Sequence, residues 1–260
     1  MKRLSGLIQG LLPFFAAILL QYSLITLLDI ALRETLPLHG WEAITLYDIG
    51  VLSALLCGLF FFFWYKSTMH YPRLVIPRQV VGLRSILLLI GLGITTQFAI
   101  SGMLSLLQPI FRQLFSNYMQ VVGSILNHRL PMVLLYVVLI APITEELIFR
   151  GVMLEKLKAD LPFYGANLIQ AAAFGIYHWN IIQGIYAFSI GLLLGYVRRS
   201  FRSLTASVLL HMAINGAAFL VVLLPNSTAS FVLSAVLGLL VSVLLCYLVY
   251  RRNEQNSCDE

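Results

Sequence analysis

Long apolar runs alternate with short polar segments along the chain. As a helix, ~20 apolar residues are long enough to cross a hydrocarbon core of ~30 Å. Eight apolar runs can be marked, with ends located to within a few residues. They lie near residues 7–28, 43–65, 84–107, 131–153, 164–179, 182–197, 204–224 and 229–249. The pattern predicts an all-α polytopic membrane protein, a bundle of about eight transmembrane helices around an intramembrane polar site.

The composition agrees with this pattern. Apolar residues make up 60% of the 260 positions, 11% are charged, and the mean hydropathy is +0.89. In a soluble domain roughly a quarter of the residues are charged. No polar stretch between the runs is long enough to form a separate soluble domain. We therefore expect residues 1–260 to form a single integral membrane domain.

The basic residues indicate how the helices are oriented. An even number of helices places both termini on one side, and Lys and Arg gather on the cytoplasmic side of membrane proteins. With eight helices, all 17 basic residues except Arg33, Arg112 and Arg129 lie on the side of the N-terminus. We expect a multi-pass protein of the cell membrane, a bacterial plasma membrane, with cytoplasmic N- and C-termini. The net charge of +6 then reflects topology and contact with the lipid bilayer, and no nucleic-acid partner is expected.

Polar side chains inside the apolar runs point to a functional site, because ionisable groups at membrane depth are rare. They occur in three predicted helices, as EELIFR (145–150), FGIYH (174–178) and HMAIN (211–215). A spacing of four residues puts Glu146 and Arg150 on one helix face, where they can pair. The same spacing places Phe174 with His178, and His211 with Asn215.

The depth of these groups in the membrane can be estimated from the sequence. The fourth and fifth helices should form an antiparallel hairpin that turns near Leu161-Pro162. Glu145 lies 16 residues before Leu161 and His178 lies 16 residues after Pro162. At ~1.5 Å per residue, both lie about 24 Å from the turn. We therefore expect the three motifs to meet within the membrane.

The three motifs, EExxxR, FxxxH and HxxxN, each in a predicted transmembrane helix, resemble those of the CAAX protease and bacteriocin-processing (CPBP/Abi) family. That family includes the CAAX-prenyl endoproteases. The stretch GLLLGYVRRSFRSLTASVLLH (191–211) is similar to the family's glycine-rich helix, basic turn and return helix. The resemblance covers roughly residues 140–220. It implies an intramembrane endopeptidase that acts on a membrane-embedded, prenylated or otherwise lipidated peptide.

The residues themselves suggest a mechanism for peptide hydrolysis. Glu145 is the candidate base that activates a water molecule, and His178 would orient that water and shuttle a proton. His211 and Asn215 could supply neutral donors to the developing oxyanion. The resemblance implies the same roles for these four residues.

Other residues near the motifs receive supporting or structural roles. Glu146 and Arg150 should hold the geometry, and Phe174 shares the helix face of His178. Tyr177, Trp179 and Asn180 are interpreted as anchors at the membrane interface. Pro142 is expected to kink the fourth helix and widen the bundle near the glutamates.

Three alternatives remain open. Zinc is a candidate cofactor, with Glu145, His178 and His211 as ligands, although HExxH is absent and a metal-free site is favoured. A proton-coupled transporter also places carboxylates and histidines at mid-membrane, but the two halves of the chain show no inverted repeat. A non-catalytic scaffold or immunity protein could use the same fold. The activity of Glu145→Ala separates these classes.

Overall fold

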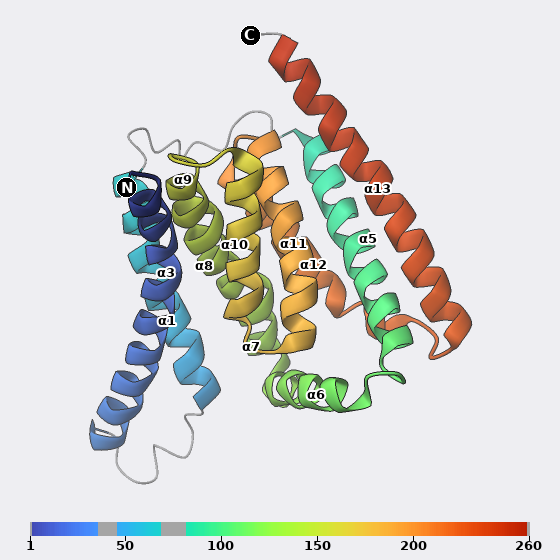
Figure 1. Ribbon diagram of the computed structural model, residues 1–260. Helices are drawn as coiled ribbons and strands as arrows, with labels where there is room; N and C mark the ends of the chain where they lie inside the picture. Colours follow the sequence, from blue (N-terminus) through green and yellow to red (C-terminus); the bar gives the residue numbers. More distant parts are fainter. Residues whose placement is uncertain (1, 36–45, 69–81, 259–260) are drawn as a thin grey trace.

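The computed structural model describes residues 2–35, 46–68 and 82–258, and within these ranges the chain is helical and contains no strand (Figure 1). The long helices are α1 (Lys2–Thr35), α3 (Leu46–Thr68), α5 (Leu83–Leu107), α10 (Phe163–Tyr177), α11 (Ile181–Ser200), α12 (Leu204–Ala218) and α13 (Thr228–Cys258). Between α5 and α10 lie α6 (Arg112–Leu126) and a continuous helix built from α7 (Leu130–Leu134), a π-helical segment (Leu135–Ile140), α8 (Ala141–Glu146), a second π-helical segment (Leu147–Met153) and α9 (Leu154–Leu157). A single 3₁₀ turn (Val221–Leu223) follows α12. The predicted all-α polytopic fold is confirmed.

Each of the eight predicted apolar runs coincides with a helix, but one of them is short. Seven helical stretches in the described ranges have the length and hydropathy needed to cross a membrane. The eighth, α10, has only 15 residues. At 1.5 Å per residue it spans roughly 22 Å, less than the ~30 Å hydrocarbon core. Its C-terminal end, which carries His178, therefore stops within the depth of the bundle.

The helices run back and forth so that α1 begins and α13 ends at the same end of the bundle (Figure 1). The α9–α10 and α11–α12 turns lie at that end too. This arrangement agrees with the even number of helices used in the charge argument. Arg73 and Arg78, which that argument includes, lie outside the described residues. The cytoplasmic location of the termini stays a prediction.

Helix α6 was not among the predicted elements, because it is amphipathic and its apolar stretches are short. It lies across the end of the bundle opposite the termini (Figure 1). Phe115 is its buried side chain, and the ring of Tyr118 packs edge-on against Tyr186 of α11 with centroids 6.2 Å apart. A helix with one apolar face is suited to lie along the bundle in this way.

Small residues allow the helix that carries the two glutamates to approach α3. A Cβ atom at Gly58 would lie 2.5 Å from Oγ1 of Thr144, so only glycine fits at this crossing. The Thr144 hydroxyl donates a hydrogen bond of 3.1 Å to the carbonyl of Ala54. Close packing of small residues with hydrogen bonds between helices is a common way to join helices in a membrane. It holds α8 in place next to the site.

Candidate active site

The two glutamates lie in α8, a short α-helical stretch between two π-helical segments. In the first segment, the Ala141 N–H bonds to the carbonyl of Tyr136, five residues back. The next residue, Pro142, has no N–H, so the carbonyl of Val137 lacks the corresponding donor. Nδ2 of Asn215 supplies it, at 2.8 Å. Pro142 thus leaves the Val137 carbonyl free to accept a hydrogen bond from α12. Turns of π-helix often occur at functional sites.

Glu146 and Arg150 form the ion pair that their spacing predicted. Nη1 of Arg150 donates to Oε1 of Glu146 at 2.9 Å, and both side chains are fully buried. Nη2 of Arg150 donates to the carbonyl of Gly191 in α11 at 3.2 Å. The guanidinium also lies over the ring of Phe174, 4.4 Å from its centroid. The pair therefore joins the glutamate helix to both α10 and α11.

Two buried amides of α10 extend this network. Nε2 of Gln170 donates to the carbonyl of Gly191 at 3.0 Å and to Oδ1 of Asn167 at 2.7 Å. Nδ2 of Asn167 donates to the carbonyl of Leu192 at 3.0 Å. Neither amide is among the residues predicted for the site. Their signal is present in the sequence: Asn167, Gln170 and Phe174 recur at helical spacing on one face of an otherwise apolar run.

Gly191 makes this arrangement sterically feasible. A Cβ atom at that position would lie 3.0 Å from both Cα and Cβ of Ala171 and 3.3 Å from Nη2 of Arg150. Helices α10 and α11 therefore approach closely at this level. The close approach brings the Gly191 carbonyl within reach of two donors at once.

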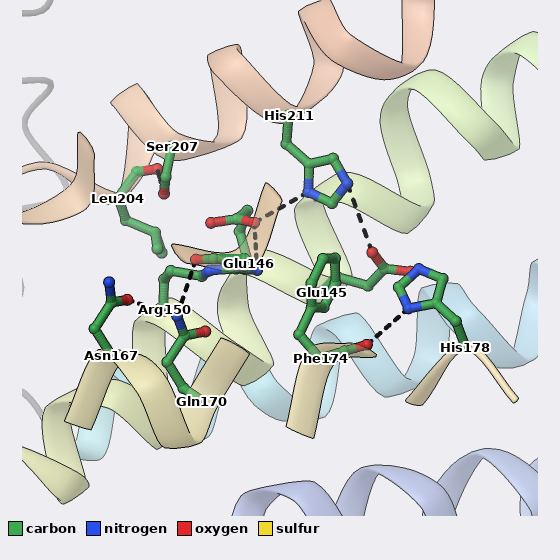
Figure 2. Close-up of polar contacts among 11 residues, drawn as sticks. Glu145, Glu146, Arg150, Asn167, Gln170, Phe174, His178, Leu204, Ser207 and His211 are labelled. Atoms are coloured by element: carbon green, nitrogen blue, oxygen red, sulfur yellow. Dashed lines mark hydrogen bonds and ion pairs between the residues drawn. The ribbon is translucent and has the colours of Figure 1, made fainter. Parts of the chain in front are cut away.

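His211 lies between the two glutamates (Figure 2). Its Nδ1 is 3.0 Å from Oε1 of Glu146, and its Nε2 is 3.7 Å from Oε2 of Glu145. Because the Glu146 carboxylate, paired with Arg150, can only accept, Nδ1 carries the proton. A neutral His211 then presents a lone pair at Nε2, and only the imidazolium can donate from that atom. The predicted role of His211 as an oxyanion donor therefore requires the protonated ring.

His178 is held in a similar way from the other side of the cavity. It is the C-terminal cap of α10, and its Nδ1 lies 2.7 Å from the carbonyl of Phe174. A carbonyl only accepts, so Nδ1 donates and Nε2 of a neutral ring is an acceptor. The ring of Phe174 meets those of His178 and His211 edge-on, with centroids 4.8 and 5.7 Å apart. Phe174 thus packs against both histidines.

Glu145, His178, His211 and Asn215 line one cavity of about 410 Å³. Figure 2 shows the carboxylate of Glu145 and the ring of His178 pointing toward each other. The Glu145 side chain is 16% exposed, whereas its neighbour Glu146 is 0% exposed. Glu145 is therefore the glutamate that a reactant in the cavity can touch.

Tyr177 and Asn180 make contacts that the sequence did not suggest. Tyr177 lines the same cavity, and its hydroxyl donates a hydrogen bond to Oε1 of Gln21 in α1. Its neighbour Trp179 has left-handed backbone, with φ 53°, and an exposed ring that also lines the cavity. Asn180 caps α11 by accepting from the N–H of Gln183 at 3.1 Å. Tyr177 is thus a wall of the cavity, and Asn180 begins a helix.

The described residues contain no group of three or more His, Cys, Asp or Glu side chains arranged to hold a metal ion. Glu145, His178 and His211, the ligands of the zinc alternative, line the cavity without forming such a group.

Residues 127–217 match a family model described as type II CAAX prenyl endopeptidase Rce1-like. The family resemblance is confirmed. The Rce1-like segment contains all three motifs and every residue assigned to the site above, apart from Gln21 of α1. No curated protein and no solved structure matches the chain significantly.

Proposed function

We propose that this protein is an intramembrane endopeptidase that hydrolyses a peptide bond of a membrane-embedded or lipidated peptide, with a water molecule activated by Glu145. The observation that carries the proposal is the single cavity that Glu145, His178, His211 and Asn215 share. The Rce1-like match supports a CAAX-type endopeptidase in general.

Water activation falls to Glu145 and His178. A water between them can donate one hydrogen to the Glu145 carboxylate and the other to Nε2 of His178, whose Nδ1–H is held by the Phe174 carbonyl. As the water oxygen attacks the peptide carbonyl, its proton passes to Glu145. Because both hydrogens of the water are bound by Glu145 and His178, a lone pair of its oxygen points toward the substrate.

Oxyanion stabilisation falls to His211 and Asn215. The His211 imidazolium, held at Nδ1 by Glu146, can donate from Nε2 to the developing negative charge. Asn215 commits one of its two amide hydrogens to Val137 and keeps the second for the oxyanion. The tetrahedral intermediate then collapses as the C–N bond breaks. Glu145 returns its proton to the leaving amine, which completes the hydrolysis.

The ion pair of Glu146 and Arg150 acts on the reaction through His211. Glu146 selects the tautomer and orientation of the ring, as a carboxylate does for the histidine of a hydrolytic triad. Arg150 keeps Glu146 ionised and is itself held by Gly191 and Phe174. We assign Glu146, Arg150 and Phe174 positioning roles.

The cavity walls favour a substrate that reaches the site through the bilayer. Ile18, Tyr22 and Ile25 of α1 line the cavity together with Glu145. Tyr22 and Trp179 are 59% and 68% exposed on the outer surface of the bundle, so the lining continues onto a surface that faces lipid. An apolar chain attached to a peptide can follow that surface while the peptide bond reaches Glu145.

The test compares cells that carry wild-type protein with cells that carry Glu145→Gln. We expect membrane peptides or lipidated proteins to accumulate uncut in the variant, as measured by membrane proteomics. Glu34→Gln, a change of the same chemistry at an exposed position, serves as the control. Identical proteomes in all three strains would count against a protease. A phenotype that Glu145→Gln retains in full would favour a scaffold instead.

A further inference from the structure

A second cavity, of about 460 Å³, lies at the end of the bundle where α9 ends and α11 turns into α12. It shares no lining residue with the cavity of Glu145. Its charged lining residues are Glu155, Lys158, Arg198, Arg199 and Arg202. Four cationic side chains thus surround one carboxylate, which is the single acid among the described residues that line the cavity.

Two of the cations are held in place by that carboxylate. Oε2 of Glu155 accepts from Nζ of Lys158 at 2.8 Å, and Oε1 lies 3.3 Å from Nη2 of Arg198. The side chain of Arg198 is only 12% exposed, so its position is set by packing as well as by charge. Glu155 therefore fixes these two cations at the cavity wall.

Arg199 is oriented without a carboxylate. Its guanidinium lies over the ring of Phe163, 4.4 Å from the centroid, and 5.4 Å from the centroid of Tyr164. Stacking holds the plane of a guanidinium and leaves its N–H groups on the edge available. In the described part of the chain, Arg199 makes no ion pair. Its charge is available to a ligand.

The turn after α11 adds the last cation. Arg202 adopts left-handed backbone, with φ 48°, a conformation that a residue with a Cβ atom rarely takes. The N–H of Ser203 bonds back to the Arg198 carbonyl at 3.3 Å and closes the turn. The tight turn brings Arg202 to the same cavity as Arg198 and Arg199.

We propose that this cavity binds an anionic phosphate group, either the headgroup of an anionic phospholipid or free phosphate. Arginine forks match phosphate oxygens in pairs, and lysine adds a point charge. The cavity sits at an end of the bundle, where lipid headgroups lie. Bound phosphate would also stabilise α11, which supplies the Gly191 carbonyl to Arg150 two turns before Arg198.

The test measures binding to the purified full-length protein in neutral detergent by native mass spectrometry. Three probes are compared: phosphatidylglycerol, phosphatidylcholine with its net neutral headgroup, and inorganic phosphate as a competitor. We expect saturable binding of phosphatidylglycerol, and weakening by about tenfold in Arg199→Gln, because charge-assisted hydrogen bonds are lost. Arg251→Gln is the matched control, since Arg251 is an exposed arginine outside the cavity lining, on α13, which ends on the same side of the bundle.

Each outcome decides the proposal. Displacement of phosphatidylglycerol by inorganic phosphate, or binding of phosphate alone with the same dependence on Arg199, identifies a soluble ligand for the same site. Arg198→Gln should weaken phosphatidylglycerol binding as Arg199→Gln does. Because the Arg199 side chain is exposed, the Arg199→Gln variant should fold normally. Equal weakening by Arg199→Gln and Arg251→Gln, equal binding of phosphatidylcholine, or no binding of either phosphate probe would overturn the proposal.

Discussion

Nδ1 of His211 lies 3.0 Å from Oε1 of Glu146, and both side chains are buried. The contact makes Glu146 more than the partner of Arg150, because it sets which nitrogen of His211 faces the cavity. In the proposed mechanism, the second glutamate of the EExxxR motif, Glu146, therefore acts on the reaction through His211 of α12. On the other side of the ring, Nε2 of His211 lies 3.7 Å from Oε2 of Glu145.

Arg150→Ala should destabilise the fold. The change leaves the Glu146 carboxylate buried and uncompensated, which typically costs ~3–5 kcal/mol. We expect a lower unfolding temperature in detergent and poor expression, together with lost activity. Arg251 is an exposed arginine of α13, so Arg251→Ala should leave the unfolding temperature, the expression and the activity unchanged. Normal stability of Arg150→Ala would contradict the buried pair.

Asn215→Ala should reduce both stability and rate. The Val137 carbonyl loses its donor, which typically costs ~1–3 kcal/mol. The loss of an oxyanion donor should also slow cleavage by about 10²–10³-fold. The two effects can be separated with Pro142→Ala, which restores a backbone N–H near Val137. The double variant should regain stability but not rate; recovery of both would show that Asn215 is structural only.

Metal removal should leave the activity unchanged, because we propose a metal-free site. Purified protein treated with a chelator should cleave at the rate of untreated protein, and elemental analysis should find no stoichiometric zinc. Nε2 of His178, Nε2 of a neutral His211 and the Glu145 carboxylate are ligand types that zinc takes, so the same residues could bind it. Zinc bound at one ion per chain, with activity lost on chelation and restored by zinc, would replace the metal-free mechanism.

Reporter fusions test the predicted topology. Fusions after Pro225, between α12 and α13, and at the C-terminus should report opposite sides of the membrane, with the C-terminus cytoplasmic. The reason is the concentration of basic residues at the end of the bundle where α1 begins and α13 ends. Two fusions on one side would refute the even number of crossings.

Much of the fold follows from the sequence because apolar runs of membrane-spanning length have few alternative structures. The Glu146–Arg150 pair follows from helical spacing alone. Contacts between helices do not, since they depend on packing: the donor from Asn215 to Val137 requires both Pro142 and the position of α12.

The limits of sequence reasoning are also visible at single residues. Asn167 and Gln170 are uncharged side chains in an apolar run, so the pattern of ionisable groups does not identify them. Tyr177 resembles an interfacial aromatic residue in sequence, and only the position of α1 makes it a cavity wall. The protonation pattern of His211 needs the distance to Glu146, which no spacing along the chain supplies.

The central claim is that Glu145 is the base, and the cleavage rate of Glu145→Gln tests it most directly. The substitution is nearly isosteric, so the unfolding temperature should stay close to that of the wild type. The substrate is a peptide that accumulates in the Glu145→Gln cells. Purified Glu145→Gln should show almost no cleavage of this peptide. His178→Ala should be similarly impaired and should cleave more slowly than Asn215→Ala. Cleavage by Glu145→Gln at the wild-type rate would contradict the mechanism.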